Sequence, residues 1–279
     1  MRILIGVTLL LGVAACGGEP NVVLPIATGP IAAPVPGPGL AAWESFPVHQ
    51  VPRPIVLTRR PPMLAGFSSD EGKLAAVAGS YEVTGPLPDA PPTVTAELPD
   101  GPAEFRTLPA EAALAGLRAA GSGAGTQPAQ PLRIQKVELG TATFGTDRGG
   151  LALPAWLFHS DQATGPIAWP ALPDEAFWKA GATVGGPGPA RLGPDGTLTL
   201  SLPAPAPPCP GEQPQRAEPV VTETDTAVAV TIRFDPPQPA GDCIQDAMLR
   251  FTEYQVRLGA PLGNRVLVDD QGAPIAVTP

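Results

Sequence analysis

Histidine, cysteine and aromatic residues are scarce in this chain of 279 residues, and their scarcity excludes several kinds of site. The sequence has two histidines, three cysteines and 5% aromatic residues. It contains no HExxH motif and no EF-hand loop, which are common sequence signatures of zinc and calcium sites. A Walker loop, a dinucleotide-binding fingerprint and a Gly-x-Ser-x-Gly nucleophile elbow are also missing. We therefore expect no metal, no cofactor and no enzymatic activity.

Positive charge and long apolar runs are scarce as well. Lys and Arg number 17 against 26 Asp and Glu, which gives a net charge of −9, and Arg59-Arg60 is the only adjacent basic pair. An acidic surface repels phosphate backbones, so we expect no nucleic-acid partner. After the first 15 residues, prolines and charges interrupt every apolar run before it is long enough to span a bilayer.

The first 16 residues, MRILIGVTLLLGVAAC, have the layout of a secretory signal peptide. Arg2 supplies a positive start, and the apolar stretch from Ile3 to Ala15 ends in small residues. As a helix this stretch would be about 20 Å long, at roughly 1.5 Å per residue, whereas a bilayer core is about 30 Å thick. We therefore predict that residues 1–15 are a signal peptide that is removed.

The last four of these residues, Val13-Ala14-Ala15-Cys16, resemble the lipobox of bacterial lipoproteins. The resemblance implies a diacylglyceryl group on the Cys16 sulfur and cleavage before that residue. Two acyl chains hold a protein stably on a membrane, whereas one gives only marginal binding. The alternative is an ordinary cysteine next to a conventional cleavage site after Ala15. We expect a lipid-anchored protein on the cell membrane, facing outside the cytoplasm.

Two cysteines, Cys209 and Cys243, remain once Cys16 carries lipid. In an exported protein an even remainder indicates a disulfide. Closing a loop of about 34 residues would stabilise the fold by roughly 3–4 kcal/mol in the chain-entropy model. A metal-binding pair and two free thiols are the alternatives, although two cysteines alone do not complete a tetrahedral zinc site.

The folded part is predicted to be mainly β, sandwich-like or built of antiparallel sheets, and rich in loops and proline. Proline and glycine number 40 and 32, yet 43% of the residues are hydrophobic. Apolar residues recur with the period of two that half-buried strands show. The clearest runs are residues 198–202, 228–234 and 254–258, with a hairpin expected over 266–277. A change of phase between 132 and 144 indicates a β-bulge, which we place at Gly140.

One short α-helix is predicted near residues 109–120, with Thr107 as its cap and Gly121 as its stop. Shorter helical turns are expected at 70–78 and 174–179.

The chain is predicted to divide into a Pro-rich disordered tether at 16–42, an N-terminal β-rich subdomain with the helix at 43–120, and a C-terminal β domain with the disulfide at 132–279. Residues 121–131 (GSGAGTQPAQP) form the linker between the last two, or else one long surface loop.

Polar candidates for a site are few. His159-Ser160-Asp161 has the residue types of a hydrolase triad, but neighbouring side chains on a strand point to opposite faces and cannot form the relay among themselves. His159 has two interpretations: it forms a relay with distant partners, or it lies in a polar strand end without a catalytic role. The acidic pairs Glu223/Asp225 and Asp269-Asp270 lie in turn-like sequence, where acids are common for backbone reasons. Calcium binding at one of them is the alternative.

Aromatic residues are concentrated in one short stretch, which makes them the candidate binding surface. In exported domains such clusters bind carbohydrate, peptide or lipid, and they also serve as the bulk of a core. Both interpretations stay open for Trp156, Phe158, Trp169, Phe177 and Trp178.

Two further segments resemble parts of uncharacterised exported proteins of high-G+C Gram-positive bacteria. They are 145–158, beginning Gly-Thr-Asp-Arg-Gly-Gly, and 261–269, Pro-Leu-Gly-Asn-Arg-Val-Leu-Val-Asp. The resemblance implies an exported protein with a disulfide and attaches no activity to either segment. The sequence therefore predicts a binding or interaction module of the cell envelope, with the membrane and an envelope protein, glycan or lipid as partners. An envelope hydrolase with an unrecognised active site and a purely structural spacer are the alternatives.

Overall fold

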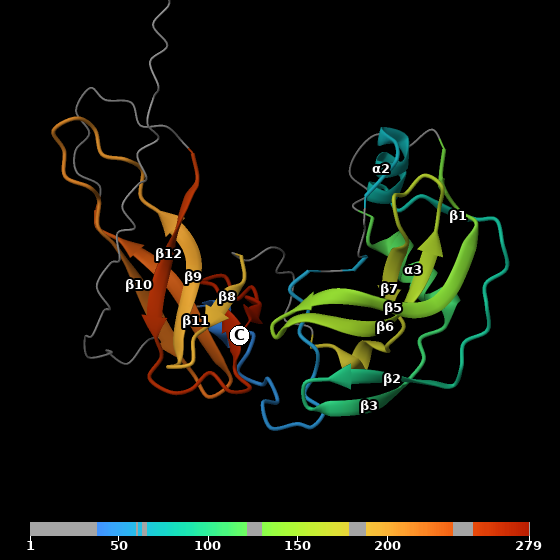
Figure 1. Ribbon diagram of the computed structural model, residues 1–279, viewed down its shortest axis with the longest axis horizontal. Helices are drawn as coiled ribbons and strands as arrows, with labels where there is room; N and C mark the ends of the chain where they lie inside the picture. The colour runs from blue at the N-terminus through green and yellow to red at the C-terminus, as the bar shows by residue number, and fades with distance from the viewer. Residues whose placement is uncertain are drawn as a thin grey trace, which may run out of the picture.

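The protein folds into two lobes made mainly of β-strands, as the alternating runs predict (Figure 1). The computed structural model describes residues 38–59, 61–62, 66–121, 130–178, 188–236 and 248–278. We call residues 66–178 the first lobe and residues 188–278 the second lobe. Residues 38–58 are called the strap, because they pack against both lobes. The predicted signal peptide, Cys16 and most of the predicted tether lie outside the described residues.

The first lobe is built around a three-stranded antiparallel sheet in the order β5-β6-β7. A parallel pair, β1-β4, and a hairpin, β2-β3, complete its strands. Its elements are α2 (Asp70–Val77), β1 (Tyr81–Val83), β2 (Thr93–Leu98), β3 (Gly101–Arg106), α3 (Ala110–Ala119), β4 (Leu132–Ile134), β5 (Lys136–Thr146), β6 (Gly149–His159), β7 (Ile167–Pro170) and η1 (Asp174–Ala176).

Strand β6 is buried on both faces, and its alternating side chains enter two different cores. Trp156 and Phe158 pack with Leu114 and Leu117 of α3. The neighbouring positions, represented by Leu153, point to the other face and pack with β2 and the strap. A strand covered on both sides in this way is apolar at nearly every position, which is why the segment 151–158 is so rich in apolar residues.

The second lobe is a β-sandwich. One sheet has the order β12-β9-β8-β14 and the other has the order β10-β11-β13. The strands are β8 (Ala190–Leu192), β9 (Thr197–Ala204), β10 (Ala217–Glu223), β11 (Ala227–Phe234), β12 (Arg250–Arg257), β13 (Val266–Val268) and β14 (Val277–Thr278). The predicted alternating residues form the core between the sheets: Leu198, Leu200, Leu202, Val228, Val230, Tyr254 and Val256. The sandwich prediction is therefore confirmed for this lobe.

The strap begins with α1 (Pro38–Ala41) and connects the two lobes. Its first half packs on the second lobe, where Trp43 donates from Nε1 to the carbonyl of Gly272 at 3.0 Å. Its second half makes bridges to the first lobe, at Ile55 with Phe177 and at Leu57 with Thr146. Folded structure therefore begins before residue 43, which corrects the predicted end of the tether.

The helix predicted near 109–120 is confirmed as α3, and the turn at 70–78 is confirmed as α2. The predicted cap is wrong, because Pro109 occupies the N-cap position without a side-chain hydrogen bond, and Thr107 lies buried before it. Gly116 faces Trp169 so closely that a Cβ there would lie 2.4 Å from the indole ring. Glycine at this position therefore permits the helix to approach β7.

Two other predictions are corrected by the strand pairing. The register between β5 and β6 is unbroken from Lys136–His159 to Thr146–Gly149, so Gly140 is not a bulge. Nor does 121–131 divide two domains, because residues on both sides of it share one hydrophobic core and β1 pairs with β4. Residues 66–121 and 130–178 thus form one unit, the first lobe.

None of the helices in the described part of the chain is long and apolar enough to cross a membrane.

Candidate functional site

The predicted aromatic surface is wrong, because the structure distributes these side chains over three cores. Trp156 and Phe158 have no exposed surface, and Trp169 packs against the same cluster. Phe177 packs in the core on the other face of the sheet. Trp178 stacks edge-on against Phe46 of the strap, with ring centroids 5.3 Å apart. The core interpretation of these residues is the one that the structure supports.

His159 stands beside a carboxylate at the end of β6. Its Nε2 lies 2.8 Å from Oε1 of Glu138, and Nζ of Lys136 lies 2.6 Å from the other oxygen of the same carboxylate. All three side chains are more than a third exposed: Lys136 at 61%, Glu138 at 41% and His159 at 35%. The hydrogen bond from Lys136, followed by that from His159, lowers the pKa of Glu138. Glu138 thus forms an exposed ion pair with Lys136 of its own strand and a hydrogen bond with His159 of β6, and Ser160 beside them accepts a hydrogen bond from the backbone of Gln162.

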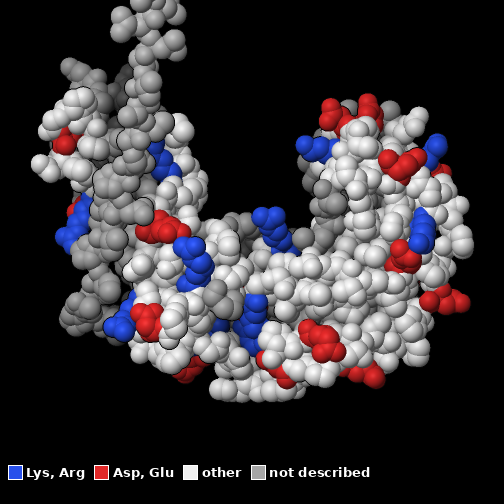
Figure 2. Space-filling model, viewed as in Figure 1, with Lys and Arg blue, Asp and Glu red and all other residues white. Residues whose placement is uncertain are grey.

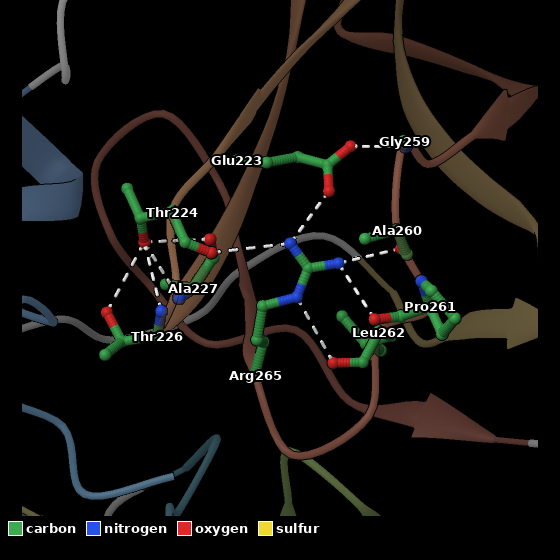
Figure 3. A network of polar contacts seen from close by, with 9 residues as sticks. All are labelled: Glu223, Thr224, Thr226, Ala227, Gly259, Ala260, Pro261, Leu262 and Arg265. Carbon is green, nitrogen blue, oxygen red and sulfur yellow. Dashed lines mark hydrogen bonds and ion pairs between the residues drawn. The ribbon is translucent and has the colours of Figure 1, made fainter.

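Glu223 is held in a polar network that ties the β10–β11 turn to the loop after β12 (Figure 3). Its carboxylate accepts from the backbone N–H of Gly259 at 2.6 Å and from Nη1 of Arg265 at 2.7 Å. Burial alone would raise the pKa of Glu223, but these two donors outweigh it and lower the pKa. The residue is therefore a structural anion rather than one half of a calcium-binding pair.

Arg265 is enclosed by carbonyl groups on the other side of the same network (Figure 3). Nη2 donates to the carbonyls of Ala260 and Pro261 at 2.8 and 2.9 Å. Nε and Nη1 reach the carbonyls of Leu262 and Thr224 at 3.4 Å. With Glu223 included, every N–H direction of the guanidinium has an acceptor, so Arg265 fixes the 259–265 loop.

The second acidic pair, Asp269-Asp270, also has a backbone role. Oδ1 of Asp269 accepts from the N–H groups of Gln271 and Ala273 at 2.9 and 2.8 Å, which closes the turn after β13. Within the described residues, no group of three or more His, Cys, Asp or Glu side chains is placed to hold a metal ion.

One buried ion pair in the described part of the chain was not predicted from the sequence. The turn between β5 and β6 carries Asp147, whose carboxylate lies 2.5 Å from Nη2 of Arg53 in the strap. Both side chains are almost fully buried, at 4% and 1% exposed. Burial raises the pKa of the Asp147 carboxyl, and the charge and hydrogen bond of Arg53 offset this only in part. We call Arg53, Asp147 and the residues that contact them the lobe junction; these residues are Phe46, Val56, Asp100, Asn264 and Val277.

The lobe junction joins both lobes and the strap. Nε of Arg53 donates to the carbonyl of Asn264 in the second lobe at 3.0 Å. The carbonyl of Asp147 accepts from the N–H of Val277 in β14 at 2.8 Å, and its own N–H donates to Val56 in the strap. The guanidinium of Arg53 also stacks over the Phe46 ring at 4.5 Å. Segments 145–158 and 261–269, which are far apart in the sequence, therefore meet here.

Asp100, in the turn between β2 and β3, completes the lobe junction. Its two carboxylate oxygens accept from the N–H of Arg53 at 3.0 Å and from Nη1 of Arg148 at 2.8 Å. Within the described residues, Nη1 of Arg53 and Oδ1 of Asp147 have no hydrogen-bond partner. Buried ion pairs seldom increase stability over apolar packing, and their best-attested role is to select one arrangement.

Above the lobe junction the two lobes stand apart. Figure 2 shows them as two masses joined at the base, with a hollow between them and basic side chains at its floor. The hollow is bounded by two lobes with separate hydrophobic cores. Its shape therefore depends on the contacts at the base.

Cys209 is buried. Cys243 and Cys16 both lie outside the described residues, so the pairing of Cys209 with Cys243 stays a prediction.

Comparisons with known proteins give no relative for this chain: no family model matches it, and no curated protein and no solved structure is similar to it.

Proposed function

We propose that this protein is an exported lipoprotein, anchored to the cell membrane through Cys16, that works as a binding or interaction module of the cell envelope. The anchor is supported by the signal-peptide layout and the Val-Ala-Ala-Cys end of the first 16 residues. Two acyl chains on one cysteine give stable attachment to a bilayer.

The observation that carries the module proposal is that the polar candidates of the described chain serve the fold. Glu223 ties two loops together, Asp269 closes a turn, and the buried Asp147 joins the lobes. A partner would therefore contact the surfaces of the two lobes, which the lobe junction holds together. Proteins that bind partners on a rigid scaffold lose less conformational entropy on association.

A hydrolase is the second candidate, because His159 lies within hydrogen-bond distance of a carboxylate, as a general base requires for its orientation. The exposure of both groups and the second bond of Glu138 to Lys136 favour a surface ion pair. Activity screens with esters, peptides and glycans, repeated on His159→Gln, decide between these interpretations. An activity that is lost in His159→Gln would replace the module proposal.

The anchor is tested by growing cells with labelled palmitate. The wild-type protein should take up label and fractionate with membranes, and Cys16→Ser should do neither. Photo-crosslinking residues placed on each lobe then test the module: a reproducible crosslink to one envelope protein, glycan or lipid is expected. Labelled Cys16→Ser would overturn the anchor, and crosslinks to no envelope component would overturn the module.

A further inference from the structure

Strand β12 forms one edge of its sheet, on the side away from the first lobe. The sheet order is β12-β9-β8-β14, and β14 is the strand that touches Asp147 at the lobe junction. Eight residues of β12, Arg250–Arg257, pair in unbroken register with β9. In the described part of the chain no strand pairs with the other side of β12.

An edge strand of this length normally carries a device that prevents pairing with another chain. Three edge strands in the described chain have seven or more residues: β5, β10 and β12. β10 contains Pro219 and β5 contains Gly140 and Gly145, whereas β12 contains neither proline nor glycine. Tyr254 and Val256 of β12 are buried in the core, and the charged residue on their face, Arg250, lies at the first position of the strand, outside residues 251–257.

The backbone groups of β12 that are free to pair can be inferred from β9. Phe251 lies opposite Pro203, which has no N–H. Proline is accepted in a ladder at a position where the two residues do not exchange backbone bonds. Since bonding positions alternate in an antiparallel ladder, Phe251, Glu253, Gln255 and Arg257 direct their N–H and C=O groups away from β9.

We propose that β12 pairs antiparallel with β12 of a second copy of this chain, about a twofold axis at Tyr254. Antiparallel pairing keeps the core face in line only if inward residues lie opposite inward residues. A twofold axis at Tyr254 places inward residues opposite inward residues. It also pairs the backbone groups of residues 251, 253, 255 and 257, which point away from β9.

The side chains support this register. Phe251, which is 52% exposed, lies opposite Arg257 of the second copy, a cation–π arrangement. Glu253 lies opposite Gln255 of the second copy, so no like charges face each other. Moving the axis to Glu253 would place two carboxylates opposite each other, which is unfavourable. A twofold self-complementary contact of this kind is the commonest form of homodimer.

The experiment uses the full chain, expressed in cells with its own leader, and carries a photo-crosslinking phenylalanine analogue at position 251. Illumination should give a product of twice the chain mass, with the crosslink mapped by mass spectrometry to the segment around Arg257. The same analogue at Leu74, an exposed position on α2, is the matched control and should give no such product.

Two further changes in the crosslinking chain test the register. Gln255→Pro removes an outward N–H without touching the bonds to β9 and should reduce the dimeric product at least tenfold, while Gln255→Ala should keep it. Should Gln255→Pro fail to fold, Arg257→Glu with the analogue kept at 251 replaces it and should shift or remove the mapped site.

The proposal would be overturned if illumination gave only the monomer, or if position 251 crosslinked to a different protein. The outcome is independent of the lipid anchor, because palmitate labelling of the same samples reports on Cys16 separately.

Discussion

Replacing Arg53 by methionine should destabilise the protein strongly at neutral pH and progressively less as the pH falls. The change removes the guanidinium that lies 2.5 Å from the Asp147 carboxylate but keeps most of the apolar stem. Breaking a buried ion pair by removing one partner costs about 3–5 kcal/mol, because the other charge stays buried without compensation.

The pH dependence follows from the remaining carboxyl. Burial already raises the pKa of Asp147 in the wild-type protein, and without Arg53 the main opposing influence is gone. The folded state then binds a proton more tightly than the unfolded state, in which an Asp pKa is about 3.9. Stability must therefore rise as the pH falls from the folded pKa toward the unfolded one, by at most about 1.4 kcal/mol per pH unit.

Urea unfolding followed by circular dichroism at pH 7, 6 and 5 measures both effects. Arg191→Met is the matched control, because Arg191 pairs with Glu253 at the surface and both side chains are more than 60% exposed. Removing such a pair should change the free energy of unfolding by less than about 1 kcal/mol at any of these pH values. A loss in Arg53→Met no larger than in the control, or one that grows as the pH falls, would refute the reasoning.

Three other predictions are as direct. Glu223→Gln should lower stability at neutral pH by about 1–3 kcal/mol, as expected for a hydrogen bond to a charged group. Because the pKa of Glu223 is lowered in the fold, the wild-type advantage should shrink as the pH falls through that pKa, in acid titrations of both proteins. Gly116→Ala should cost about 1–3 kcal/mol by overpacking, whereas Gly188→Ala, which meets nothing within 4 Å, should leave the thermal midpoint unchanged. Non-reducing peptide mapping should recover Cys209 linked to Cys243, and a link to any other cysteine would contradict that pairing.

The strands of the second lobe could be predicted because each has one face in a core and one face in water. Leu198, Leu200 and Leu202 alternate with threonine and serine, and the structure places all three in the sandwich core. The same rule misled at β5, where the apolar phase changes. The cause is not a bulge: Val137 and Phe144 enter cores on opposite faces of the sheet. A strand covered on both sides does not show a single phase.

The aromatic stretch shows a different limit. Trp156, Trp169 and Trp178 are close in sequence, and closeness along the chain was the only reason to group them. Strand β6 turns into β7 and then into η1, so Trp156 and Trp169 share one core whereas Trp178 reaches another. A cluster in the sequence becomes a cluster in space only when the backbone keeps the side chains on one face.

Sequence alone thus predicted the features that depend on local patterns and that the structure confirms: the main strands and the helix at Ala110–Ala119. Tertiary structure decided how the chain divides and what joins its parts. Asp147 and Asn264 lie 94 and 211 positions after Arg53 in the sequence, yet both accept hydrogen bonds from its buried side chain. Nothing local marks a charged residue as buried, because its burial depends on the partner that the fold brings to it.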